Sequence, residues 1–472
     1  MRISFKPEDK TLLDKVFRFA RGRRIKLFIV GGYLRDIILT RRKENPDIDF
    51  CLKSGAINFG RALAKELKAG FVVLDKEHGA CRIVKNIKDK TYTLDFTDFK
   101  GRALQDDLLR RDFTINTLAI EPGTGILIDK YGALKDLESK VIKLAHKKAF
   151  DEDPLRILRA FSFSAILGFK IDKTTLSLAQ SRRKKLSLIS FERIRDELFK
   201  ILDSACAFET FSRLDELGIL SVILPEIEPM RGLKQGPYHH LDIWMHSLES
   251  LRQIEMVLEE FKNNKDIQKY LNEFISAERR RRALVKLGAL LHDIGKPRAL
   301  RRRKGKIIFH GHEKVGVDIS EGIAGRLKLS NDEWSSLRKM IFWHLRPGFM
   351  ADNDPVSERA KFRYFRDAQN EAISTLLISL ADQRSTRGRL TTKTSRQQHE
   401  RAVHALIKEF FKKQKERKVL PLVNGNDLMR EFKLPPSPLI GKILRGLEEL
   451  QAIGKIKTKE EAIKAAGKFA KK

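Results

Sequence analysis

Short hydrophobic runs alternate with amphipathic stretches over the first 145 residues. The segments KLFIVGG, DIDFCL, GFVVLD, ACRIV and YTLDFTDF have the length and the β-branched or aromatic content of strands. INFGRALAKELK, which lies between the second and third of them, spaces its hydrophobic residues along one face of a helix. We therefore predict an α/β domain here, with a mixed sheet and flanking helices.

The rest of the chain is predicted to be helical. From Pro154 to about Leu224 hydrophobic residues recur at helical spacing, without a strand signal. Residues 225–237, rich in proline and glycine, separate this region from a second helical region that ends near residue 390. The lysine-rich end is helical, with breaks at LPLVNGND and KLPPSP. The predicted domains are 1–145, 146–225, 226–390 and 391–472.

Charge indicates the class of partner. Lysine and arginine number 95 against 62 aspartates and glutamates, so the net charge is +33, which favours a polyanionic partner. No hydrophobic run reaches the length of a membrane span or a signal-peptide core, so nucleic acid is expected rather than a membrane. Cys51, Cys81 and Cys206 are far apart, which argues against disulfides or a zinc site and fits the cytosol. Basic runs recur along the chain, among them Arg279–Arg282, Arg301–Lys304 and Lys412–Lys418.

NPDIDF, at residues 45–50, places Asp47 and Asp49 two positions apart on a predicted strand. Side chains at this spacing point to the same face, where two carboxylates repel each other unless a cation lies between them. Carboxylate oxygens suit Mg²⁺, and a pair of such ions can activate a hydroxyl and stabilise a transferring phosphoryl group. Taken alone, the pattern also fits a solvated strand edge or a turn.

The preceding residues favour the metal interpretation. FIVGGYLRD (28–36) predicts a strand, a turn at Gly31 and Gly32, and a helix that carries Arg35. Glycines let the backbone approach an anion, and a helix N-terminus presents free N–H groups to phosphate. This order of elements is expected where a triphosphate is held beside two metal ions.

Five motifs, in order, resemble those of class II nucleotidyltransferases, the tRNA CCA-adding enzymes and bacterial poly(A) polymerases. They are VGGYLRD with NPDIDF, LLRRDFTINTLAI (108–120), DKYGALKDL (129–137), DEDPLRILRAFSF (151–163) and ERIRDELFKIL (192–202). The resemblance implies template-independent, Mg²⁺-dependent addition of nucleotides to the 3′ end of tRNA. CTP is the expected substrate, joined by ATP in enzymes that build the whole CCA end.

The motif match also implies residue roles. Asp47 and Asp49 become the catalytic metal ligands. Asp153 and Arg156 are expected to read the base in place of a nucleic-acid template, and their spacing with Arg159 predicts one side of a helix. The expected nucleotide-binding residues are Gly31, Gly32, Arg35, Arg111, Asp112, Asn116, Asp153, Arg156 and Arg159.

The motif RRDFTIN has a physical interpretation of its own. Arg111 can neutralise triphosphate charge, and by resemblance Arg159 shares that role. Asp112 and Asn116 can hold the sugar or shape the pocket. One departure from many relatives is Ser162, which stands where they have an arginine. A contact to the distal phosphate is therefore expected to be missing.

The connection before the second motif is short. Only KGRA or so separates YTLDFTDF from the helix of DDLLRRD, where enzymes that add all three nucleotides usually carry a longer flexible segment. In this respect the chain resembles the subgroup that adds CC, which implies a separate A-adding enzyme. Full CCA addition stays open as the alternative, with another segment compensating for the missing one.

Histidines gather in the second helical region. The order of His246, His292-Asp293, His312, His344 and Asp382 resembles the HD phosphohydrolase superfamily. Imidazole and carboxylate together bind transition metals, so Ni²⁺, Mn²⁺ or Co²⁺ is expected, with water activated to attack a phosphoester. The resemblance implies substrates such as 2′,3′-cyclic phosphates and 2′-nucleotides. The His-Asp pair is expected on a helix, and His310 is the alternative to His312.

Two other functions are less favoured. Bacterial poly(A) polymerases usually carry a basic GRRF-like stretch after the Asp-X-Asp strand, where this chain has LDKEHGACRIVKN, and usually lack an intact HD domain. A phosphohydrolase whose first domain only binds RNA is opposed by the intact nucleotidyltransferase motifs. The basic tail is expected to contact the tRNA body through backbone charge and shape, near the acceptor and elbow.

Overall fold

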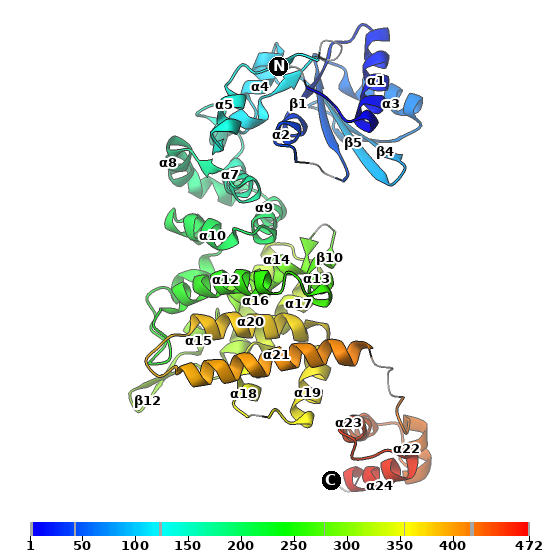
Figure 1. The fold of residues 1–472 in the computed structure, drawn as a ribbon, viewed down its shortest axis with the longest axis vertical. Coiled ribbons are helices and arrows are strands. Elements are labelled where there is room, and N and C mark those ends of the chain that lie inside the picture. Colours follow the sequence, from blue (N-terminus) through cyan, green and yellow to red (C-terminus); the bar gives the residue numbers. More distant parts are fainter. Residues whose placement is uncertain are drawn as a thin grey trace. The chain divides into compact units, whose positions relative to one another are not determined.

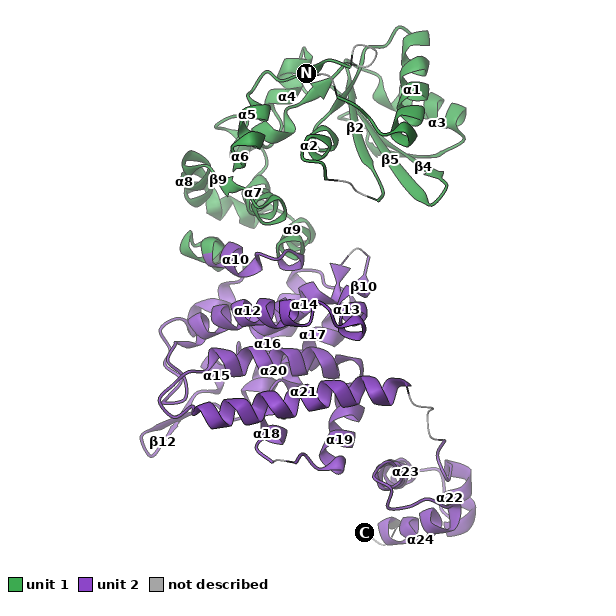
Figure 2. Ribbon diagram, in the orientation of Figure 1, with its two compact units in different colours: residues 1–201, 213–223 green, residues 202–212, 224–472 purple. Residues whose placement is uncertain are grey.

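The computed structural model describes residues 3–41, 44–121, 125–277, 279–353, 355–415 and 420–470. The chain divides into two compact units, which Figure 2 draws in different colours: residues 1–201 with 213–223, and residues 202–212 with 224–472. None of the described helices is both long and apolar enough to cross a membrane.

A mixed sheet forms the core of the first unit (Figure 1). Within the described residues its strand order is β3-β4-β5-β2-β1-β6-β7, and β2 runs parallel to β5 while the other pairs are antiparallel. All five predicted strands are present; β6 and β7 were not predicted, because two residues carry no alternation. The strands are β1 (Leu27–Val30), β2 (Asp47–Leu52), β3 (Gly70–Asp75), β4 (Ala80–Ile87), β5 (Lys90–Asp98), β6 (Ala119–Ile120) and β7 (Leu127–Ile128).

Helices cover the two faces of the sheet differently. Aromatic side chains of α1 (Pro7–Gly22) and the predicted helix α3 (Ala56–Leu67) pack on one face, against Phe50 and Phe96. On the other face Leu104 and Leu108 of α4 (Leu104–Leu109) pack with Cys51. Because strand side chains alternate, Asp47 and Asp49 share the face of Cys51.

Helices follow the sheet in the first unit, as predicted, but one short strand pair was missed. β8 (Val141–Ile142) and β9 (Lys170–Ile171) pair in parallel. The prediction that no strand follows Pro154 is therefore wrong, because the two-residue strand β9 lies in that region. Apart from α2 (Gly32–Ile38), which lies between β1 and β2, the helices here are α5 (Ala133–Glu138), α6 (Ala149–Glu152), α7 (Arg156–Leu167), α8 (Lys173–Arg182), α9 (Phe191–Asp203), α10 (Ala207–Glu216) and α11 (Ile219–Ile223); the boundary between the two units falls within α9 and α10.

The second unit is built around α20 (Ala372–Ser385), which is buried along most of its length. α12 (Ile243–Glu260), α14 (Arg281–Leu291), α17 (Asn331–Trp343) and α21 (Lys393–Lys415) pack against it. Two hairpins interrupt the predicted helical region, β10 (Phe274–Ser276) with β11 (Arg279–Arg280) and β12 (Arg301–Arg303) with β13 (Lys306–Ile308). The remaining helices here are α13 (Lys265–Asn272), α15 (Lys296–Ala299), α16 (His312–Arg326), α18 (Arg346–Ala351) and α19 (Glu358–Ala368).

The end of the chain forms a small helical cluster. It contains α22 (Gly425–Phe432), α23 (Pro438–Ala452) and α24 (Lys459–Ala470), with Leu428 and Ile443 in its core. The predicted breaks at LPLVNGND (420–427) and KLPPSP (433–438) overlap the starts of the next helices, since α22 begins at Gly425 and α23 at Pro438. Of the predicted basic run Lys412–Lys418, the part at 416–418 lies outside the described residues.

Candidate functional site

Three carboxylates share one face of the sheet in the first unit. Asp47 is exposed on β2, and Asp49, which is half-buried, lies in register with Asp95 on β5. Arg82 on β4 donates to Asp95 at 2.8 and 2.7 Å; this hydrogen bond, with the charges of all three carboxylates, raises the pKa of Arg82. Sequence reasoning missed Asp95, because only the strand register places it beside Asp49. This set of oxygen donors fits Mg²⁺.

Gly31 allows a guanidinium to approach these carboxylates. Its φ of +80° is unfavourable for other residues, and a Cβ there would lie 2.6 Å from Nη1 of Arg111 and 3.4 Å from Oδ2 of Asp49. Arg111 also donates to Asp107 at 3.3 Å. Burial opposes its charge, but Asp107 and Asp49 outweigh that effect and raise the pKa of Arg111. Arg111 is therefore held as a cation beside the Asp-X-Asp pair.

Hydrogen bonds connect α2 to α7 through the second motif. Arg35 donates to Asn116 at 2.7 Å, Asn116 donates to Asp112 at 2.8 Å, and Arg159 donates twice to Asp112. Burial opposes the charge of Asp112, but Arg159 outweighs it and lowers the pKa of that carboxyl. Arg35 is buried and also binds Asp36, so its direct contact with a nucleotide, like that of Gly32 beside it, stays a prediction.

A cavity of about 290 Å³ brings the second and fourth motifs together beside Asp49. Its wall is rich in arginine, which suits a triphosphate. Asp47 lines a separate cavity of about 270 Å³ with Tyr33 and Arg41. The residues around the first cavity are Asp49, Thr97, Lys100, Asp107, Arg110, Arg111, Asp112, Asp153, Arg156, Arg159 and Arg193.

The predicted helical arrangement of Asp153 with Arg156 is wrong. Asp153 is extended, with φ −144° and ψ 99°, because it precedes Pro154 and ends α6, whereas Arg156 begins α7. Asp153 accepts from Arg193 of α9 at 2.9 Å, and Arg156 donates to the carbonyl oxygen of Arg110 at 2.7 Å. Both side chains still line the cavity. Sequence reasoning missed Arg193, which lies in the fifth motif.

Ser162, where many relatives have arginine, is buried between two helices. Its hydroxyl donates to Glu197 of α9, and Glu197 accepts from Lys200 at 2.8 Å. The position therefore connects α7 to α9 in this chain.

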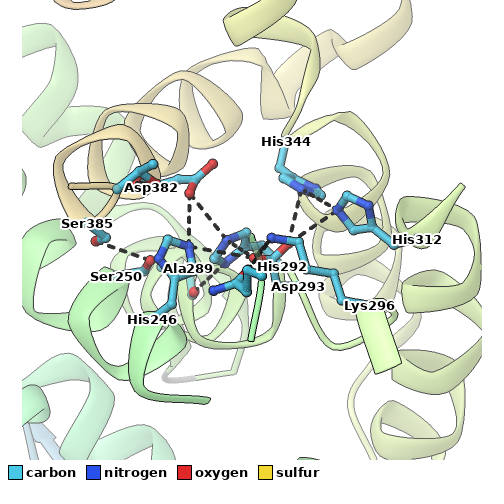
Figure 3. Close-up of polar contacts among 12 residues, drawn as sticks. His246, Ser250, Ala289, His292, Asp293, Lys296, His312, His344, Asp382 and Ser385 are labelled. Carbon is cyan, nitrogen blue, oxygen red and sulfur yellow. Dashed lines mark hydrogen bonds and ion pairs between the residues drawn. The ribbon is translucent and has the colours of Figure 1, made fainter. Parts of the chain in front are cut away.

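A second candidate site lies in the second unit, where the six expected ligands form two groups (Figure 3). His292 and Asp293 follow α14 in the turn that ends it, so the expected helix position is wrong. The two groups adjoin at Asp293, whose Oδ2 lies 3.2 Å from Nε2 of His292 and 3.6 Å from Nε2 of His246, whereas only a single site was expected. His312 belongs to one of them, whereas His310 is exposed outside both. The groups are His246, His292 and Asp382, and Asp293, His312 and His344; within each, the donor atoms lie within 4.8 Å of one another.

Three of the imidazoles share one orientation. The Nδ1 atoms of His292, His312 and His344 each donate to the carbonyl oxygen three residues earlier, at 2.8, 2.8 and 2.6 Å. Each ring therefore carries a proton on Nδ1 and turns Nε2 toward the cluster, where Nε2 can bind a metal ion when it carries no proton. Nε2 of His312 and Nε2 of His344 are only 3.2 Å apart. Two lone pairs at this distance fit a cation between them.

Charge in this cluster favours a cation. Burial opposes the charge of His292, but Asp293 and Asp382 outweigh it and raise the pKa of His292 to about 10. Both carboxyls have a pKa well below the usual range despite burial, chiefly through His292 in the case of Asp293 and through hydrogen bonds from His246 and His292 in the case of Asp382. Burial, with the neighbouring imidazoles, lowers the pKa of His344 to about 3. A mixed imidazole and carboxylate set of this kind fits a transition metal.

Sequence reasoning missed two residues beside this cluster. Lys296 places Nζ 2.6 Å from Oδ2 of Asp293 and donates to Gln235 at 2.6 Å. The ring centroid of His239 lies 4.8 Å from that of His246, and burial, with Lys296, lowers the pKa of His239 to about 3. The available signals were the lysine in HDIGKP and the histidines in PYHH.

Known protein families match successive parts of the chain. The Poly A polymerase head domain matches residues 27–143, and a model named RNA and SrmB-binding site of polymerase A matches 168–231. The HD domain matches 243–387, and tRNA nucleotidyltransferase domain 2 matches 417–466.

Relatives match almost the whole chain. An A-adding tRNA nucleotidyltransferase of Deinococcus radiodurans is 30% identical over 92% of this chain and 93% of its own. A CC-adding tRNA nucleotidyltransferase of Thermus thermophilus is 28% identical over 92% of each. The solved Thermotoga maritima CCA-adding enzyme complexed with tRNA has a TM-score of 0.65 and 21% identity, over 99% of this chain and 98% of its own, which supports the fold. The chain belongs to the class II tRNA nucleotidyltransferases, the enzymes that build the CCA end of tRNA.

Proposed function

We propose that this enzyme adds two C residues to the 3′ end of tRNA from CTP and leaves the final A to a separate enzyme. The observation that carries this proposal is the connection between β5 and α4, which consists of residues 99–103 alone. Asp106 accepts from the backbone N–H groups of Arg102 and Ala103 at 2.8 and 3.0 Å, and Asp107 from that of Lys100 at 3.1 Å. Such a short, fastened connection has little freedom to reshape the pocket for a second base.

The hydrogen bonds that hold this connection also involve residues of the base-reading cavity. Asp107, which holds the connection through Lys100, also accepts from Arg111, and all three residues line the cavity with Asp153 and Arg156. In full CCA-adding enzymes the longer segment is expected to help the pocket switch from C to A. A pocket whose wall is tied to residues 99–103 would keep one base preference.

The residues around the cavity suit nucleotidyl transfer. Asp47 and Asp49 would hold Mg²⁺, which would supply the Lewis acidity that activates the tRNA 3′-hydroxyl and offsets phosphate charge. Arg111 and Arg159 bring positive charge to the triphosphate. The 3′ oxygen forms a bond to the α-phosphorus, and the bond to the leaving pyrophosphate breaks. Asp153 and the guanidinium of Arg156 offer an acceptor and donors to a base edge.

Addition of A alone is the second candidate. The A-adding enzyme of Deinococcus radiodurans is 30% identical to this chain. The CC-adding enzymes of Thermus thermophilus and Geobacter sulfurreducens are each 28% identical to it. These identities are too close to separate the two specificities. The short connection argues against a switch from C to A, and we favour CC because the chain resembles the CC-adding subgroup in this respect.

Incorporation assays separate the candidates. The purified protein would receive tRNA lacking its last three nucleotides, or tRNA ending in CC, with CTP, ATP or both, and products would be sized at single-nucleotide resolution. Two C residues and a halt in the presence of ATP would support the proposal. Addition of A to the CC-ended tRNA alone would support A addition, completion to CCA would refute the role of residues 99–103, and long A tails would indicate poly(A) polymerase activity.

We propose that the HD cluster is a second active site, which hydrolyses phosphoesters. Its two ligand groups would hold two transition-metal ions, Ni²⁺, Mn²⁺ or Co²⁺, whose Lewis acidity would activate water and offset phosphate charge. Water adds to phosphorus and the ester oxygen leaves with a proton. Lys296, beside Asp293, is placed to orient that carboxylate. Hydrolysis of 2′,3′-cyclic AMP, measured with each metal and after chelation, tests this proposal; no hydrolysis with any metal would refute it.

A further inference from the structure

A cavity of about 320 Å³ adjoins the HD cluster. One part of its wall is formed by His344 and Asp382, which belong to different ligand groups, so the cavity reaches both. The rest of the wall comes from α18 and the residue after it, α20 and α21. A molecule in this cavity can therefore place one end at the expected metal ions.

The chemistry of the wall differs from that of the head cavity. Among the described residues that line it there is no lysine or arginine, although the chain carries a net charge of +33. Its charged side chains, Asp352 and Asp382, are both carboxylates, which disfavour an RNA backbone or a polyphosphate. The other polar residues offer neutral amides, hydroxyls and an imidazole: Gln383, Gln398, Ser379, Ser395 and His399.

Several of these groups are held in place. Gln398 donates through Nε2 to the carbonyl oxygen of Ala351 at 3.0 Å, which leaves Oε1 as an acceptor. His399 is 7% exposed and its Nε2 lies 2.9 Å from the hydroxyl of Ser379. Its Nδ1 is buried and has no hydrogen-bond partner among the described residues. Burial lowers the pKa of His399, so the imidazole is a neutral hydrogen-bonding group.

An aromatic side chain also lines the cavity. Phe349 of α18 is 62% exposed, which is unusual for phenylalanine in a helical domain. Exposed aromatic rings serve as stacking surfaces for bases, at about 1–3 kcal/mol per base. A stacking ring beside side-chain amides, of which Gln398 is held by a hydrogen bond, is an arrangement that recognises a nucleobase.

We propose that this cavity is the base-binding pocket of the HD site, which takes a single nucleoside phosphate. The phosphate lies at the end formed by His344 and Asp382, the base stacks on Phe349, and Gln383 and Gln398 bind its edge. The volume, about 320 Å³, is near the lower limit for small-molecule pockets, which suits one nucleoside. The inference rests on the proposed phosphoester hydrolysis for its reaction, but the binding of the base can be measured separately.

Substrates with and without a base test the pocket. The full-length enzyme would hydrolyse 2′,3′-cyclic AMP, CMP, GMP and UMP, and methyl riboside 2,3-cyclic phosphate, which has the same reacting group without a base. We expect Gln398→Leu and Phe349→Ala to lower the ratio of nucleotide to base-free kcat/KM about tenfold or more, because each removes one contact to the base. The matched control is Gln397→Leu, the same substitution at an exposed position of α21, which should leave the ratio unchanged.

If the ratio of nucleotide to base-free kcat/KM stays within about twofold of wild type in both variants, the proposed base-binding pocket is refuted. Calorimetric titration with 2′-AMP distinguishes this failure from failure of the hydrolysis. Suppose that no substrate is hydrolysed, but Gln398→Leu weakens 2′-AMP binding about tenfold and Gln397→Leu does not. The base-binding pocket is then supported and the proposed hydrolysis is refuted. If hydrolysis proceeds but both variants bind 2′-AMP as wild type does, the pocket is refuted. Melting temperatures and nucleotide addition by the head would show that the variants are folded.

Discussion

Arg159 donates two hydrogen bonds to a single oxygen of Asp112, Oδ2, from Nε at 3.0 Å and from Nη2 at 2.7 Å. The other oxygen of Asp112 accepts from Asn116 at 2.8 Å. Asp112 is 7% exposed, so its carboxylate holds the guanidinium from the buried side of the cavity wall. The second and fourth motifs, which are more than 40 residues apart, therefore act through one ion pair.

Asp112→Asn is expected to reduce nucleotide addition while the protein stays folded. The amide keeps the shape of the side chain but loses the charge that orients Arg159, so kcat/KM for CTP should fall about 10- to 100-fold. The melting temperature should fall as well, by the equivalent of about 1–3 kcal/mol. Asp14→Asn, an exposed carboxylate on α1, is the control and should change neither value. Equal kcat/KM in wild type and Asp112→Asn would show that the pair does not position Arg159 for the reaction.

The stabilisation by Asp112 should depend on pH. Its pKa in the folded protein is below the ordinary value, which is about 3.9 in an unfolded chain. The stabilisation is therefore complete above the unfolded-state pKa and is lost as the pH falls through the folded-state pKa. The difference in melting temperature between wild type and Asp112→Asn should be largest near pH 7 and should narrow below about pH 4. A difference that grows in acid would contradict the lowered pKa.

Gly31→Ala is expected to abolish most nucleotide addition. The added Cβ would meet Arg111 at 2.6 Å and would displace it from Asp49. Gly132→Ala is the matched control, since Gly132 has a similar φ of +76° but no atom within 4 Å of an added Cβ. Gly132→Ala should lose about 1–2 kcal/mol of stability from left-handed backbone strain. Gly31→Ala should lose about 1–3 kcal/mol, because its ψ of −140° lies in a region that other residues rarely adopt. Only Gly31→Ala should lower kcat/KM further, about tenfold or more; equal losses would assign the whole effect to strain.

His292→Ala is expected to release metal from the HD cluster and to abolish phosphoester hydrolysis. His292 contributes Nε2 to one ligand group, and its loss also removes an imidazole that lies 3.2 Å from Oδ2 of Asp293. Elemental analysis of the purified protein should detect less bound Ni²⁺, Mn²⁺ or Co²⁺. His310→Ala, an exposed histidine of the same unit, should keep both metal and hydrolysis. Nucleotide addition by His292→Ala should stay within about twofold of wild type; its loss would show that the two activities are not separate.

The sequence by itself determined the longer strands and helices and the residue types expected at the two candidate sites. Alternation in DIDFCL was enough to predict that Asp47 and Asp49 share a face opposite Phe50, because side chains along a strand alternate whatever lies beside it. The motifs predicted which charged residues to expect near the nucleotide, and HEKVG favoured His312 over His310. These properties are local, so a few neighbouring residues suffice to specify them.

The tertiary structure decided how these residues are grouped. Asp95 stands beside Asp49 only through the register of two strands, and Arg193 reaches Asp153 from a helix 40 residues away. Four ligands from separate segments, His246, His312, His344 and Asp382, meet around the adjacent pair His292 and Asp293. The cavity beside the HD cluster is likewise assembled from three helices. Contacts of this kind depend on packing between distant segments, and no local pattern of residues records that packing.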